Sequence, residues 1–263
     1  MRNKFLPAIG LALVMLLVCA ASGAAQTSSS IHLEPGTVSI GAMYNGAQVT
    51  LTGTIPASAQ VLVEVKGERD KVVLSKKGKA FGLLWMNTGE VSLENAPTVY
   101  MLNLPEAYSS EEDGGNAALT SLGVGFDKLA GEVSIESSDC DANNKALFEE
   151  FVKLKKKEGL YALNNNAVKY TGEKNGVRSF SCNISLPPRM KQGDYVVTAV
   201  VIKDGKAAER DDRPLEIKRV GIPEFMAKVA YEHGALYGII ASVIAIMAGL
   251  GMGLIFGGDG GSH

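Results

Sequence analysis

Residues 48–66 read QVTLTGTIPASAQVLVEVK, and this stretch decides the fold class. Gln48–Ile55 alternates apolar and polar residues, which is the pattern of a strand with one face buried and one face in water. Val61–Lys66 is rich in β-branched residues, and Ile55-Pro56 breaks the pattern between the two runs. The stretch therefore predicts two β-strands joined by a turn.

The same pattern of short β-rich runs separated by turn residues continues over residues 26–105. Turn-forming pairs such as Asn45-Gly46, Lys77-Gly78 and Thr88-Gly89 separate short β-rich runs. Short strands with a turn signal about every ten residues are typical of an all-β sandwich of the immunoglobulin-like kind. Residues 26–105 are therefore predicted to be a β-sandwich domain. Its further strands are Thr37–Met43, Lys71–Ser75, Phe81–Met86, Val91–Leu93 and Thr98–Leu104.

After an irregular connector at residues 106–144, residues 145–221 are predicted to form a helix plus β-strand unit. The helix covers 145–158, with an apolar stripe, Asn143 or Asn144 as its cap and Gly159 as its stop. Asp204-Gly205 predicts a two-residue hairpin turn. Two β-units with the helix between them are favoured over an extension of the first sandwich. The strands expected here are Ala167–Thr171, Val177–Leu186, Tyr195–Lys203 and Ala207–Lys218.

Residues 1–25 have the three parts of a secretory signal peptide. Arg2 and Lys4 form a basic start, an apolar run follows, and small residues lead up to a cut after Ala24 or Ala25. Two other interpretations remain open: an uncleaved anchor helix, and a lipoprotein cut before Cys19. Export of the region that follows is the prediction.

A second apolar run, residues 234–256, is expected to be a transmembrane helix. It carries no charged residue, and at 1.5 Å per residue it covers about 34 Å, enough to cross a hydrocarbon core of about 30 Å. Residues 222–233 form a juxtamembrane segment and residues 257–263 a short cytoplasmic tail. The predicted location is the inner membrane, single-pass, with the main domain in the periplasm. The basic residues Lys218, Arg219 and Lys228 oppose this orientation under the positive-inside rule, but a long exported domain is translocated largely regardless of charge.

The composition and motifs of the chain argue against nucleic-acid binding and enzyme activity. The formal net charge is −2 with 26 Lys+Arg and 28 Asp+Glu, so a basic nucleic-acid-binding surface is not indicated and no nucleic acid is expected as a partner. The sequence has no catalytic Ser, Cys or phosphate-binding motif, and its three His have no paired metal-binding spacing. We therefore predict no catalytic residues, no metal ligands, no cofactor and no enzyme activity.

Two cysteines, Cys140 and Cys182, remain after the signal peptide. An even number of cysteines in an oxidising compartment favours a disulfide, although two buried thiols are equally consistent with the sequence.

Small residues recur every four positions along the predicted span, at Ala241, Ala245, Gly249, Gly253 and Gly257. That spacing places them on one helix face, where they permit close packing against another helix in lipid. The partner would be a second copy of this chain or a multispan membrane protein, besides the lipid of the inner membrane.

Several short stretches stand out together by their order and spacing: Gly36–Ile40, Tyr44–Ala47, Val63–Gly67, Trp85–Thr88, Asn95–Tyr100, Glu158–Tyr161, Leu186-Pro187, Gly193–Tyr195, Asp204-Gly205, Lys218–Gly221 and Leu236–Gly238. In these stretches the chain resembles the proteobacterial "putative transmembrane protein" family of exported, C-terminally anchored proteins. The resemblance implies a signal peptide, an exported β-rich domain and one C-terminal span, and it implies an accessory role beside membrane transporters of the sulfite-exporter type.

These observations give two hypotheses for the function. The first is a non-enzymatic, membrane-anchored periplasmic accessory or interaction protein, associated with an inner-membrane transport or redox complex. The alternative is a homodimeric periplasmic module that senses a ligand or stress.

Overall fold

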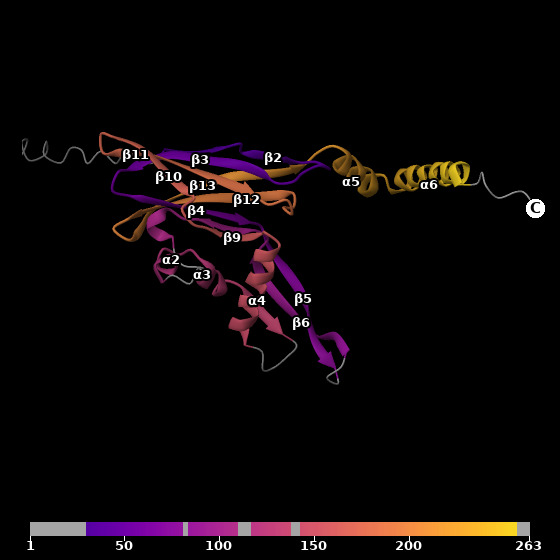
Figure 1. Cartoon of the computed structure of the whole chain (residues 1–263), viewed down its shortest axis with the longest axis horizontal. Helices are drawn as coiled ribbons and strands as arrows, with labels where there is room; N and C mark the ends of the chain where they lie inside the picture. The colour runs from indigo at the N-terminus through magenta and orange to yellow at the C-terminus, as the bar shows by residue number, and fades with distance from the viewer. Residues whose placement is uncertain (1–29, 81–83, 110–116, 138–142, 257–263) are drawn as a thin grey trace, which may run out of the picture.

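The computed structural model describes residues 30–80, 84–109, 117–137 and 143–256 (Figure 1). The predicted signal peptide and the predicted cytoplasmic tail both lie outside these residues, so their predictions remain untested.

The body of the molecule is a β-sandwich of two sheets. Both sheets are mainly antiparallel, and β2 and β9 add parallel pairs at the edges of the larger one. The smaller sheet has the order β1 (Ser30–Glu34), β3 (Ala47–Pro56), β11 (Val177–Leu186) and β10 (Val168–Lys174). The larger has the order β2 (Thr37–Ile40), β13 (Lys206–Arg219), β12 (Gly193–Lys203), β4 (Gln60–Gly67), β7 (Tyr100–Asn103) and β9 (Tyr161–Asn164).

The alternation read from the sequence places the main core between the two sheets. Val49 and Leu51 of β3 point into it from the smaller sheet, and Val63, Val65 and Val197 point into it from the larger. All five side chains are fully buried. The mainly β fold class is therefore confirmed, and the driving force is burial of β-branched and leucine side chains.

The predicted division into two successive β-units is wrong. Each sheet combines strands from residues 30–104 with strands from residues 161–219, so the later strands complete the first sandwich. β3 pairs with β11, where Thr50 Oγ1 donates to Asn183 Oδ1 across a separation of 133 positions. Local alternation shows which residues face a core, but it does not show which distant strand is the neighbour.

A long hairpin projects from the sandwich, and we call residues 69–97 the arm (Figure 1). It consists of β5 (Arg69–Ala80) and β6 (Leu84–Pro97), and β8 (Ser134–Ser137) pairs with it near its base. The predicted breaks at Lys77-Gly78 and Thr88-Gly89 do not end strands. A register shift between Lys76 and Lys77 absorbs an additional residue as a β-bulge, so the strands continue through the glycines.

The segment predicted as an irregular connector contains short helices that cover the outer face of the larger sheet. They are η1 (Glu106–Tyr108), α2 (Ala117–Ser121) and α3 (Phe126–Ala130), followed by α4 (Asn144–Lys157). The α4 prediction is confirmed, with the Asn143 side chain accepting from the N–H groups of Lys145 and Ala146 at 3.0 and 3.4 Å. A second core forms beneath these helices, and in it the Tyr161 ring contacts the rings of Tyr100, Phe126 and Phe151.

Two helices end the described chain. α5 (Ile222–Glu232) follows β13 directly, and α6 (Gly234–Phe256) coincides with the predicted span. Within the described residues, α6 is the one helix long and apolar enough to cross a membrane, and none of its apolar window is buried against the protein. It extends away from the sandwich as a free rod (Figure 1).

Candidate functional site

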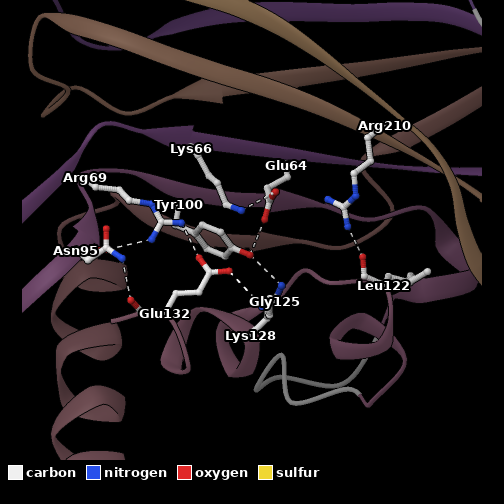
Figure 2. A network of polar contacts seen from close by, with 10 residues as sticks. All are labelled: Glu64, Lys66, Arg69, Asn95, Tyr100, Leu122, Gly125, Lys128, Glu132 and Arg210. Carbon is white, nitrogen blue, oxygen red and sulfur yellow. Dashed lines mark hydrogen bonds and ion pairs between the residues drawn. The ribbon is translucent and has the colours of Figure 1, made fainter. Parts of the chain in front are cut away.

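A polar network lies where the larger sheet, the base of the arm and the α2–α3 segment meet (Figure 2). Its centre, formed by Glu64 and Tyr100, is buried beside the apolar side chains of the second core, so these two polar groups need partners inside the protein. The network fixes the base of the arm against the larger sheet and the α2–α3 segment.

Glu64 is the buried charge of this network, with a relative exposure of 2%. It lies on the outer face of β4, between apolar residues that fill the main core from the other face. One carboxylate oxygen pairs with Lys66 Nζ at 2.9 Å, and the other accepts from the Tyr100 hydroxyl at 2.8 Å. A buried carboxylate with two charge-assisted partners is tolerated, whereas the same carboxylate without them would be strongly destabilising.

The Tyr100 hydroxyl links the sheet to the α2–α3 segment. While it donates to Glu64, it accepts from the Gly125 N–H at 2.8 Å. Gly125 has φ of 103°, a conformation that side chains rarely adopt, so a glycine is required to present this N–H. Burial and the adjacent Glu64 charge raise the pKa of Tyr100, so the hydroxyl keeps its proton at all physiological pH values.

A second set of contacts fixes the base of the arm. Arg69, the first residue of β5, pairs with Glu132 at 2.6 Å and donates to the Asn95 carbonyl at 3.3 Å. The Asn95 side chain donates to the Glu132 carbonyl at 2.9 Å, and Lys128 Nζ lies 3.5 Å from the Glu132 carboxylate. The hydrogen bond from Arg69 lowers the pKa of Glu132, so the carboxylate stays charged and the tie persists to acidic pH.

On the opposite side of the network, the Arg210 guanidinium of β13 donates to the Leu122 carbonyl. Together, the three sets of contacts join β4, β7, β13 and the arm to the α2–α3 segment. The arm therefore leaves the sandwich in a fixed direction, stabilised by polar ties as well as by the second core.

Asn95 gives a direct test of this arrangement. It adopts φ of 64° at a bulge of β6, and its side chain holds Glu132. We expect Asn95→Ala to lower the free energy of unfolding by about 2 kcal/mol, because it loses the hydrogen bond and strains the backbone. Asn95→Gly keeps the backbone relaxed and is expected to cost only about 1 kcal/mol. Urea denaturation of the full chain in detergent measures both, and equal costs would contradict the strain argument.

Beside the network, the outer face of the larger sheet carries an open groove of about 510 Å³. Glu64, Thr198 and Asp212 lie opposite one another on β4, β12 and β13, and Thr198 Oγ1 donates to Asp212 at 2.7 Å. Charges of both signs line the groove, and Glu64, Lys66, Arg69 and Arg210 are engaged in the contacts described above. Among the described residues, no three His, Cys, Asp or Glu side chains gather to hold a metal ion.

Cys182 lies on β11 and is fully buried in the main core, where burial raises the pKa of its thiol to about 12. Its proposed disulfide partner Cys140 lies outside the described residues, so the disulfide stays a prediction.

The predicted packing face lies on α6, except for Gly257, which is outside the described residues. Within the described chain, Gly249 and Gly253 have no atom within 4 Å of a Cβ built on them, so that face is open to a neighbouring helix. Exposed aromatic side chains lie on α5 and in the first turn of α6: Phe225, Tyr231 and Tyr237 are 60%, 91% and 38% exposed. Aromatic side chains at that position are typical of a membrane–water interface.

Sequence reasoning missed most of the polar network. One signal was available, since Glu64 interrupts the apolar run VLVEVK at a position where both faces of the strand are buried. Arg69, Tyr100, Gly125 and Glu132 offered none, because their partners come together only through the tertiary fold.

Three comparisons bear on the identity of the chain. A family model described as "Putative transmembrane protein (Alph_Pro_TM)" matches residues 30–257, which is most of the chain. No curated protein matches its sequence. Among solved structures, a family 123 glycoside hydrolase from Clostridium perfringens, studied for glycolipid glycan hydrolysis, aligns with 10% identity over 74% of this chain and a TM-score of 0.25. The alignment spans 28% of that hydrolase, and a similarity this low carries no argument.

Proposed function

Because the chain belongs to the family described as "Putative transmembrane protein", and because its β-sandwich continues into a fully exposed apolar helix, we propose that it is a membrane-anchored, non-enzymatic accessory protein of an inner-membrane transport or redox complex. In this proposal the sandwich and arm lie in the periplasm, and α6 binds the complex within the lipid.

The observation that carries the proposal is the open, small-residue face of α6. Gly249 and Gly253 lie one helical turn apart, with Ala241 and Ala245 preceding them on the same face. In lipid, apolar surface does not drive helices together, so a flat face that allows close backbone approach favours a specific helix partner. A simple tether would not need such a face.

We expect Gly249→Leu combined with Gly253→Leu to abolish recovery of a partner. The two leucines fill the flat face and separate the helix backbones, so van der Waals packing is lost. The measurement is chemical cross-linking in native membranes, followed by purification of the full chain in mild detergent. A second integral membrane protein should accompany the wild-type chain.

Gly251→Leu is the matched control, because residue 251 lies on the opposite face of α6 and receives the same added side chain. It should retain the partner. Recovery of the wild-type chain alone as a monomer would contradict the proposal, and recovery as a pure homodimer would support the sensing module in its place.

A further inference from the structure

The outer half of the arm has a composition unlike the rest of the chain. From Lys71 to Gly89 the sequence contains four lysines, at 71, 76, 77 and 79, and no Asp or Glu. We define the arm tip as residues Lys76–Ala80 of β5 and Leu84–Asn87 of β6. The chain's only tryptophan, Trp85, lies in this tip opposite Lys79.

The strand register sorts the tip into two different faces. In the strand register, Gly78 and Ala80 lie opposite Met86 and Leu84, so apolar residues share one face at the outermost part of the tip. Lys77 and Lys79 lie opposite Asn87 and Trp85, so the other face combines cations with an aromatic residue. An apolar surface beside lysines and tryptophan is the combination found where proteins contact the boundary between lipid headgroups and acyl chains.

No described strand other than β5 and β6 themselves reaches the tip. β8 pairs with β6 at Val91–Glu94, nearer the base, and no described strand pairs beyond that point. Met86 is 51% exposed, and Lys77 and Asn87 are exposed as well. A projecting hairpin end that exposes Met86 beside lysines indicates contact with something outside the chain.

The placement of the arm identifies that contact. Gly67, where β4 leads into the arm, lies opposite Tyr195, and Gly193 lies opposite Ile217 near the end of β13. β13 continues through Arg219 into α5 and α6. The arm and the anchor therefore leave the sandwich from the same end, and the arm slants away from the line of α5 and α6 (Figure 1).

The arm also has the stiffness that a fixed contact needs. Arg69 is tied to Glu132 at 2.6 Å, and Lys71 pairs with Glu94 at 2.8 Å across the two strands. Buried Val91 and Leu93 of β6 are part of the second core. The base is thus held by the sandwich and its covering helices, while the tip extends free.

From these observations we propose that the arm tip is a second membrane-binding element, which docks on the anionic phospholipid surface of the bilayer that α6 spans. The lysines pair with lipid phosphates, and Trp85, on the same face as Lys79, enters the headgroup region together with the apolar residues at the end of the tip. The inference rests on the anchoring role of α6 but not on any protein partner.

The single tryptophan makes the test direct. The full chain is reconstituted into nanodiscs of phosphatidylcholine, with or without phosphatidylglycerol, and with or without brominated acyl chains. We expect brominated lipid to quench Trp85 fluorescence in the anionic discs and much less in the neutral ones. Raising salt from about 0.15 M to about 1 M, which shortens the screening length from about 8 Å to about 3 Å, should weaken the quenching.

Lys77→Glu and Lys79→Glu should each reduce the docked-to-free ratio of the tip about fivefold or more, and together they should bring quenching to the neutral-disc level. The matched control is Lys203→Glu with Lys206→Glu, at the β12–β13 turn. That turn lies at the far end of β13 from α5, roughly 45 Å away along the strand, so quenching should be unchanged.

Equal fluorescence in brominated and ordinary anionic discs would overturn the proposal, as would undiminished quenching in the double lysine variant. Protection of Trp85 in native membranes but not in lipid-only discs would also overturn it, because a protein would then cover the tip. Each of these results leaves α6 in the bilayer, so none of them is confused with failure of the proposed accessory role.

Discussion

Replacing Ile244 and Met247 by lysine is expected to release the full chain from the membrane. Both side chains lie in the middle of α6 and are 58% and 68% exposed, so in the bilayer they face lipid. Each lysine near the centre of a span costs about 3 kcal/mol, and two together cost about 6 kcal/mol, which removes the preference of the helix for lipid. The measurement is the fraction of chain that stays in the pellet after alkaline carbonate extraction.

The matched control places the same charges at the ends of α6, as Leu236→Lys with Leu254→Lys. Lysine side chains near the ends of a span reach the headgroups and cost far less, so this variant should stay in the pellet. A central double variant that also stays in the pellet would mean that α6 does not span the bilayer. Carbonate strips surface-bound protein, so contact through the arm tip alone would not mimic a span.

The second large effect is expected at Tyr100, where Tyr100→Phe should lower the free energy of unfolding by about 3 kcal/mol. The change removes one oxygen and leaves the Gly125 N–H without its acceptor. It also leaves Glu64, which is 2% exposed, with one hydrogen bond fewer to a buried negative charge. Hydrogen bonds to charged groups and orphaned buried donors are the costly cases.

Tyr161→Phe is the matched control for Tyr100→Phe. Tyr161 is 1% exposed, lies in the same aromatic cluster and donates a single hydrogen bond of 2.7 Å to the neutral Pro97 carbonyl. It should cost about 1 kcal/mol. Urea denaturation of the full chain, followed by far-ultraviolet circular dichroism of the sheets, compares the two variants. Equal costs would show that the Tyr100 hydroxyl is not a bridge.

The features that the sequence predicts well are those set by neighbours along the chain. Val177–Leu186 is a strand with the predicted bounds, Asn143 caps α4, and Asp204 and Gly205 both adopt positive φ as a hairpin turn requires. The length of the α6 run and its lack of charged residues are enough to predict a membrane-spanning helix. Each of these signals is complete within about twenty residues, so no knowledge of the tertiary fold is required.

The features that the sequence did not predict depend on distant partners. Gly78 and Gly89 predict breaks within the arm because glycine commonly ends a strand, and a bulge that allows the strands to continue has no local signature in the sequence. The polar network has no sequence signal for a related reason. Arg69, Tyr100 and Glu132 come within hydrogen-bonding distance of their partners only when the α2–α3 segment covers the sheet. The candidate packing face on α6 was visible because it repeats every four residues.

The interleaved order of strands has a consequence for how the chain matures. β3 and β4 emerge early from the ribosome, yet their partners β11 and β12 are made only after more than a hundred further residues. Until then these strands present uncovered apolar faces and open edges to any holdase or protease they meet. The final strand, β13, ends three residues before α5, so the sandwich closes only as the anchor itself is being made. A chain truncated before β11 would therefore lack the strands that cover β3 and β4 as well as the apolar helix that follows β13.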